Sequence, residues 1–101
     1  MSDFVFAAKL SDLAEGTITA VYIDETPVAL TRVGERVFAF GNVCTHDDGP
    51  LHEGHIEDNC AVCPRHGARF DLITGQPTFP AVARIPIYEV KVEQENVLVK
   101  L

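Results

Sequence analysis

Two short cysteine–histidine segments constrain this chain more than any other feature. Cys44-Thr45-His46 and Cys63-Pro64-Arg65-His66 each bring a thiol and an imidazole together, and sixteen residues separate the two segments. Thiolate sulfur and imidazole nitrogen are donors that proteins offer to transition metals. The surrounding stretch, residues 41–80, holds all three cysteines, all four histidines, five of the seven glycines and four of the six prolines. The apolar residues of such an irregular stretch are too few to order its backbone by themselves. A bound metal group can supply the missing folding free energy.

The donor set indicates which metal group these segments hold. In a two-iron, two-sulfide cluster each iron takes two protein ligands beyond the bridging sulfides, so two Cys/His pairs match one cluster. Neutral imidazoles in place of two thiolates make the cluster less negative, which favours electron uptake and raises the reduction potential. We therefore expect one [2Fe–2S] cluster per chain, with four ligands: Cys44, His46, Cys63 and His66.

Other uses of these residue types have weaker support. Four nitrogen and sulfur donors on two loops could form a structural zinc site, although such sites more often use Cys-x₂₋₄-Cys pairs. Cys60 and Cys63 have Cys-x-x-Cys spacing, but no helix is expected to begin there and lower a thiol pKa. Cys60 is therefore expected to be a small buried apolar residue on a strand. His52 and His55 lie in a polar turn, where we expect them to be solvated rather than metal ligands.

Outside residues 41–80 the chain predicts short strands separated by turns, which is typical of an all-β domain. The valines on either side of the polar break at 94–96 alternate with a period of two, so the two flanking strands are expected to pair as a hairpin. The expected strands cover residues 4–9, 17–23, 28–33, 36–40, 85–93 and 97–101.

Length and charge limit the class of protein. A chain of 101 residues has room for one compact domain, residues 1–101. Eight Lys and Arg against fifteen Asp and Glu give a net charge of −7. This charge argues against binding to nucleic acid or an anionic membrane, because both need a basic surface. The sequence shows no export signal and no apolar run near the roughly 20 residues of a membrane span, so we expect a cytoplasmic protein.

The Cys/His segments and their flanks resemble the Rieske iron–sulfur family, whose motif is Cys-x-His followed, after a similar gap, by Cys-x-x-His. Residues 63–71 and the pair Thr74-Gly75 look like its second cluster loop and the turn after it. The resemblance covers essentially the whole chain and is to the free-standing Rieske ferredoxins of bacterial multicomponent, ring-hydroxylating oxygenases. It implies the Rieske fold: three stacked antiparallel sheets, with a small cluster-binding subdomain at about 41–80. Cys44 and Cys63 would bind the inner iron, and His46 and His66 the outer iron.

The sequence departs from the high-potential Rieske proteins of respiratory complexes. Those proteins carry two further, disulfide-linked cysteines where this chain has Gly49 and Arg65. Ser and Tyr hydroxyls that donate hydrogen bonds to the cluster in such proteins correspond to Ala68 and Phe70 here. Two aspartates also follow His46 and add negative charge. The resemblance therefore implies a cluster of low potential.

By this resemblance the protein is a soluble one-electron carrier and not an enzyme. It would be a monomer that passes electrons from an NAD(P)H-dependent flavoprotein reductase to a terminal oxygenase. An oxygenase itself needs a second iron held by two histidines and a carboxylate, and only His52 and His55 remain for it. The alternative is the small Rieske-like subunit of a nitrite reductase or another redox complex. Transient docking would use the cluster tip, formed by Asp47, Asp48, Pro64, Arg65 and residues 76–80.

Overall fold

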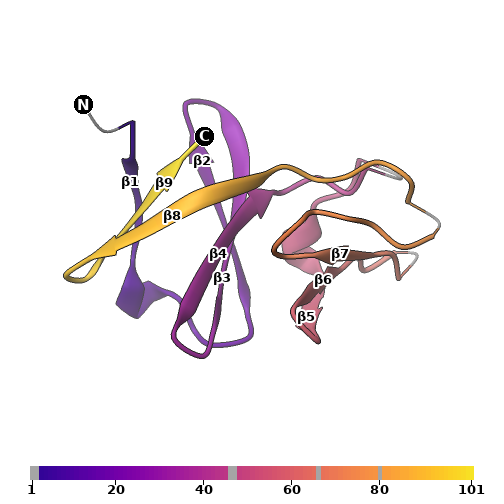
Figure 1. Cartoon of the computed structure of the whole chain (residues 1–101), viewed down its shortest axis with the longest axis horizontal. Coiled ribbons are helices and arrows are strands. Elements are labelled where there is room, and N and C mark those ends of the chain that lie inside the picture. The colour runs from indigo at the N-terminus through magenta and orange to yellow at the C-terminus, as the bar shows by residue number, and fades with distance from the viewer. Residues whose placement is uncertain (1–2, 46–47, 66, 80) are drawn as a thin grey trace.

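Two antiparallel β-sheets carry nearly all of the regular structure in the computed structural model, which describes residues 3–45, 48–65, 67–79 and 81–101 (Figure 1). The expectation of an all-β protein is confirmed. Two of the predicted ligands, His46 and His66, lie outside the described residues, as do Asp47 and Pro80 of the predicted docking surface.

The larger sheet has six strands in the order β1-β9-β8-β4-β3-β2. It consists of two three-stranded halves, joined where Ala39 and Phe40 of β4 pair with Tyr88 and Ile87 of β8. With the separate three-stranded sheet described below, these halves correspond to the three antiparallel sheets that were expected. The strands are β1 (Val5–Lys9), β2 (Ile18–Ile23), β3 (Thr26–Val33), β4 (Arg36–Gly41), β8 (Ile87–Glu93) and β9 (Asn96–Lys100).

Turn chemistry sets the ends of these strands. The β2–β3 turn consists of Asp24 and Glu25 alone, with φ of 48° and 69°, the left-handed conformation of a two-residue hairpin turn. Strand β3 therefore begins at Thr26, two residues earlier than predicted. The predicted β8–β9 hairpin is confirmed, with Glu93 opposite Asn96 across its turn.

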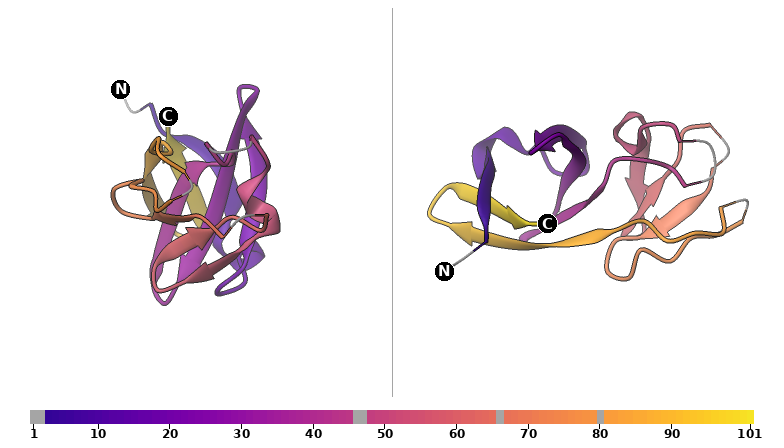
Figure 2. Two further views of the ribbon diagram at one scale, coloured as in Figure 1. Left: turned by 90° about the vertical axis from the view of Figure 1, so that its right-hand side faces the viewer. Right: turned by 90° about the horizontal axis from the view of Figure 1, so that it is seen from above.

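The smaller sheet lies at the end of the molecule opposite the β8–β9 turn (Figure 2). Its order is β5-β6-β7, and it follows a single-turn 3₁₀ helix, η2 (Leu51–Glu53). The description of residues 41–80 as irregular was therefore incomplete, because strands of three residues are too short to show an alternating pattern. The three strands are β5 (His55–Glu57), β6 (Cys60–Val62) and β7 (Arg69–Asp71). We call this three-stranded unit the cluster sheet.

The chain passes from the larger sheet to the cluster sheet after β4 and returns before β8. These two passages are hydrogen-bonded to each other. Gly41 N–H donates a hydrogen bond of 2.9 Å to Pro86 O. A Cβ at Gly41 would lie 2.7 Å from Pro86 Cγ, so only glycine permits this approach. One apolar core continues across the junction, from Phe38 and Phe40 on β4 to Phe70 on β7. This shared core fixes the position of the cluster sheet relative to the larger sheet.

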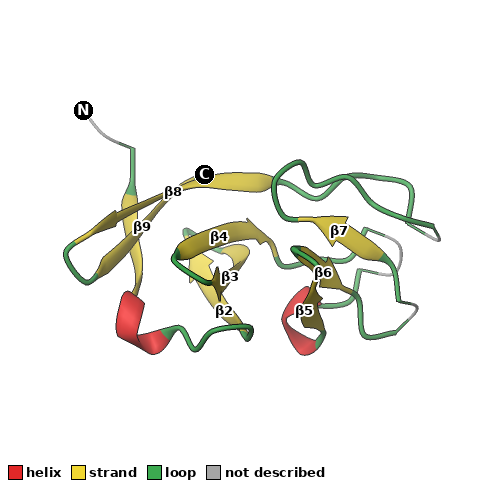
Figure 3. Cartoon of the chain, turned by 60° about the horizontal axis from the view of Figure 1, so that its bottom comes forward, coloured by secondary structure: helices red, strands yellow, loops and turns green. Residues whose placement is uncertain are grey.

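Side chains from the strands of the six-stranded sheet form a second apolar core, which includes Leu30, Val97 and Val99. The other 3₁₀ helix, η1 (Leu10–Asp12), follows β1 (Figure 3). Within the described ranges, no helix is long and apolar enough to cross a membrane.

Candidate metal centre

The two cysteine loops have the same backbone hydrogen-bond pattern. In each loop the cysteine N–H donates to the carbonyl oxygen five residues later, and the N–H four residues later donates to the cysteine carbonyl oxygen. That fourth residue has a positive φ in both loops, 61° at Asp48 and 72° at Gly67. Each cysteine thus occupies an equivalent place in a tight loop. The bonds are Cys44–Gly49 (2.7 Å) and Asp48–Cys44 (2.8 Å), then Cys63–Ala68 (2.8 Å) and Gly67–Cys63 (3.1 Å).

Both loop cysteines are buried in the apolar core that spans the junction. Cys44 is 0% exposed and Cys63 is 2% exposed, and they share this core with Leu51, Phe70 and Leu72. Neither forms a disulfide. Two thiols held in equivalent loops, away from water and in one core, fit the thiolate ligands of a single iron–sulfur cluster.

A third loop, the connection from β7 to β8 (residues 72–86), lies beside the first cysteine loop. Thr45 Oγ1 donates a 2.6 Å hydrogen bond to Ala83 O, which ties the two loops together. Phe79 and Val82 in the third loop are 88% and 87% exposed. The loop that Thr45 joins to the first cysteine loop therefore carries two strongly exposed apolar side chains.

The expectation that His52 is a solvated turn residue is wrong. His52 belongs to η2 and is partly buried, and its backbone N–H donates to Asn42 Oδ1 at 2.7 Å. Asn42 Nδ2 lies 2.9 Å from His52 Nδ1, and because the amide nitrogen is a donor, Nδ1 accepts. Asn42 is itself buried, at 8% exposed. This pair ties the segment before Cys44 to η2, and no pattern in the sequence indicated it.

The other two side chains assigned outside the ligand set lie on strands. Cys60 begins β6, as predicted, but is only partly buried. Burial, and next the charge of Asp71, raise the pKa of the Cys60 thiol. His55 begins β5 and is exposed. In the part of the chain that the structure describes, no group of three His, Cys, Asp or Glu side chains could hold a metal ion.

Comparison with known proteins agrees with this geometry. The family model for the Rieske [2Fe-2S] domain matches residues 3–89. The ferredoxin component of the naphthalene 1,2-dioxygenase system of Pseudomonas putida is 33% identical over 99 residues, which are 97% of this chain and 95% of that protein. The ferredoxin of carbazole 1,9a-dioxygenase from Nocardioides aromaticivorans IC177 superposes with a TM-score of 0.93 at 35% identity, covering 98% of each chain.

Two further solved structures are similar to this chain. A ferredoxin-type chain from a complex of reduced oxygenase and oxidized ferredoxin in carbazole 1,9a-dioxygenase gives a TM-score of 0.88 at 31% identity, covering 99% of this chain and 94% of that one. A Mycobacterium tuberculosis protein assigned as an NADH-dependent nitrite reductase small subunit gives 0.86 at 23% identity, covering 95% and 92%. At that identity the second likeness shows the fold alone. The chain belongs to the Rieske [2Fe–2S] family, and within it to the ferredoxins, which carry electrons by means of a [2Fe–2S] cluster.

Proposed function

We propose that Cys44 and Cys63 supply the two thiolate ligands of the cluster and that His46 and His66 supply the two imidazole ligands. The equivalent, buried positions of the two cysteines support this assignment. The chain has only three cysteines, so four thiolates from one chain are impossible. In this proposal residues 1–101 form one Rieske domain, and residues 41–80 or thereabouts form its cluster-binding subdomain.

The protein acts as a monomeric cytoplasmic carrier between an NAD(P)H-dependent flavoprotein reductase and a terminal oxygenase. When bound, the cluster takes up and releases one electron. Relatives named as ferredoxin components of naphthalene and carbazole dioxygenases support the oxygenase as the acceptor, and so does the solved complex of an oxygenase with its ferredoxin.

The residues around the two thiols support a low reduction potential. Ala68 and Phe70 are both 0% exposed and carry no hydroxyl that could donate a hydrogen bond to the cluster. Donors of that kind stabilise the reduced, more negative form. We therefore expect a potential near the low end of the Rieske range, at roughly −150 mV.

Partner proteins dock at the third loop and the cysteine loops. Phe79 and Val82 are exposed apolar side chains on the loop that Thr45 joins to the first cysteine loop, and exposed apolar patches mark interaction surfaces. The described members of the predicted docking surface, including Asp48 and Arg65, are also exposed, except for Pro77, which is partly buried. Redox encounters of this kind are small, typically below about 1,200 Å² of total buried area, and short-lived.

Replacing Phe79 tests the docking proposal. Phe79→Ser should raise the KM for this protein roughly 5- to 30-fold in a coupled NADH oxidation assay with its reductase and oxygenase, because an anchor side chain contributes about 1–2 kcal/mol. The kcat should stay unchanged. Tyr22→Ser is the matched control, since Tyr22 is 76% exposed on β2 of the six-stranded sheet. Equal KM values for the two variants would contradict docking at this loop.

A further inference from the structure

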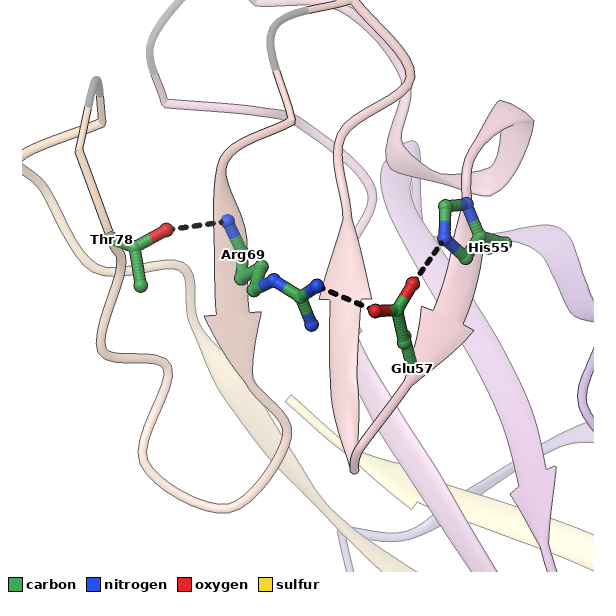
Figure 4. A network of polar contacts seen from close by, with 4 residues as sticks. All are labelled: His55, Glu57, Arg69 and Thr78. Carbon is green, nitrogen blue, oxygen red and sulfur yellow. Dashed lines mark hydrogen bonds and ion pairs between the residues drawn. The ribbon is translucent and has the colours of Figure 1, made fainter.

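A network of polar contacts crosses the cluster sheet from its edge strand β5 to β7 (Figure 4). One oxygen of Glu57, Oε1, accepts a hydrogen bond of 2.6 Å from the Arg69 guanidinium. The other oxygen, Oε2, accepts one of 3.0 Å from His55 Nε2. Strand β6 lies between β5 and β7, so these side chains join two strands that are not backbone neighbours.

The same Arg69 holds the third loop through its backbone. Thr78 N–H donates to Arg69 O at 2.8 Å, and Arg69 N–H donates to Thr78 Oγ1 at 2.9 Å. Both hydrogen-bonding groups of the Arg69 backbone are thus bonded to Thr78. Glu57 acts on the Arg69 side chain, and Thr78 is bonded to the Arg69 main chain.

Thr78 directly precedes the exposed side chains of the third loop. Phe79 follows it in sequence, and Ala81 N–H donates to Thr78 O at 3.0 Å. Phe79 and Val82 make little contact with the rest of the protein, since both are more than four-fifths exposed. Their position therefore depends on how firmly the neighbouring backbone is held, and Thr78 is a main attachment.

We propose that Glu57 and Arg69 are positioning residues for partner docking. By fixing Arg69 at the start of β7 they fix Thr78, and through Thr78 they fix the direction in which Phe79 and Val82 project. The proposal rests on the docking function assigned above to Phe79 and Val82. A segment already held in its docking conformation loses less conformational freedom on binding, which strengthens the encounter without a new contact.

Hydrogen exchange in the cluster-loaded protein tests the positioning step without any partner. Glu57→Gln and Arg69→Gln should each speed exchange of the Thr78 and Ala81 amides roughly two- to five-fold, the range that an exposed ion pair can contribute. The double variant should exchange no faster than the faster single variant, because the two residues act as one unit. Arg69→Lys should recover part of the protection. The control is Glu93→Gln, which removes an exposed pair with Lys91 (3.2 Å) in the larger sheet.

Several outcomes would overturn the proposal. One is exchange at Thr78 and Ala81 that matches the Glu93→Gln control, and another is effects that multiply in the double variant. Faster exchange that extends to buried β3 residues would show a general loss of stability instead of local positioning.

In the coupled assay Glu57→Gln should raise KM two- to five-fold at constant kcat, with no further effect in a Phe79→Ser background. Altered exchange together with an unchanged KM for Phe79→Ser would disprove docking at this loop while leaving the attachment itself established.

Discussion

At the scale of single residues, two neighbouring side chains lower the pKa of the Glu57 carboxyl group. Hydrogen bonds from Arg69, and next from His55, lower the pKa of Glu57 below its usual value of 4.5. Because the folded-state pKa is lowered, the ion pair stabilises the folded protein above pH 4.5. This contribution disappears as the pH falls through the folded-state value.

Arg69→Gln should therefore raise the pKa of Glu57 towards 4.5. An NMR titration of the Glu57 carboxyl carbon would measure the shift. An unchanged Glu57 pKa in the variant would show that the contact with Arg69 is not maintained in solution.

The roles of some residues can be predicted from the neighbouring sequence, and the roles of others cannot. Cys44 and Cys63 could be proposed as ligands from the sequence because the Cys/His spacing within one loop is a local property. The Asn42–His52 pair spans ten residues and the Glu57–Arg69 pair spans twelve, and each forms only once the strands are assembled. No sequence periodicity records such contacts, which explains why His52 was assigned to solvent.

At the scale of elements, the turn after β7 depends on Gly75. This residue has a φ of +80°, and a Cβ there would lie 2.3 Å from Ile85 O. Gly34, in the β3–β4 turn, has a φ of +62° but no atom within 4 Å of its ideal Cβ position. Gly34→Ala thus has only the backbone penalty, about 1 kcal/mol, whereas Gly75→Ala adds a collision with backbone.

We expect Gly75→Ala to lower the free energy of unfolding by about 2–4 kcal/mol, clearly more than Gly34→Ala does. Urea denaturation of the two cluster-loaded variants would compare them. A loss for Gly75→Ala that is no larger than for Gly34→Ala would contradict the close approach of Ile85.

The elements of the six-stranded sheet were largely predictable, and those of the cluster sheet were not. Alternating valines mark the buried face of β9, because Val97 and Val99 are fully buried, whereas Val92 of β8 is 44% exposed. The three strands of the cluster sheet have only three residues each, which is too short for an alternating pattern to be recognised. Their order depends on long-range packing around Phe70, which a sequence pattern does not express.

At the scale of the whole molecule, net charge governs how a carrier meets its partners. A charge of −7 favours a reductase with a basic docking surface, and salt screens such attraction beyond about 10 Å at 0.1 M. The second-order rate of reduction by the reductase should therefore fall as salt is added, in stopped-flow measurements. Asp48→Asn, in the first cysteine loop, should weaken this salt dependence more than Glu95→Gln, in the β8–β9 turn at the opposite end (Figure 1). A rate independent of salt would exclude electrostatic steering.

The arrangement of the two sheets shows a limit of prediction at this scale. The Cys/His motif led to the family and so to its three-sheet fold, and the comparisons confirm that inference. The motif carries no information about the junction, where Gly41 contacts Pro86 and one core runs from Phe38 to Phe70. These contacts join residues more than thirty positions apart, so they follow from the folded chain alone.

In the proposed ligand assignment, two cysteines and two histidines of this chain hold the [2Fe–2S] cluster. Nitrogen-sensitive pulsed electron paramagnetic resonance of the reduced protein tests it most directly, with Cys60→Ser as the comparison. We predict two imidazole nitrogens coupled to the cluster, in the wild type and in Cys60→Ser alike, and loss of both couplings together with the cluster in Cys44→Ser or Cys63→Ser. A reduced cluster without nitrogen coupling, or loss of the cluster in Cys60→Ser, would contradict the ligand assignment.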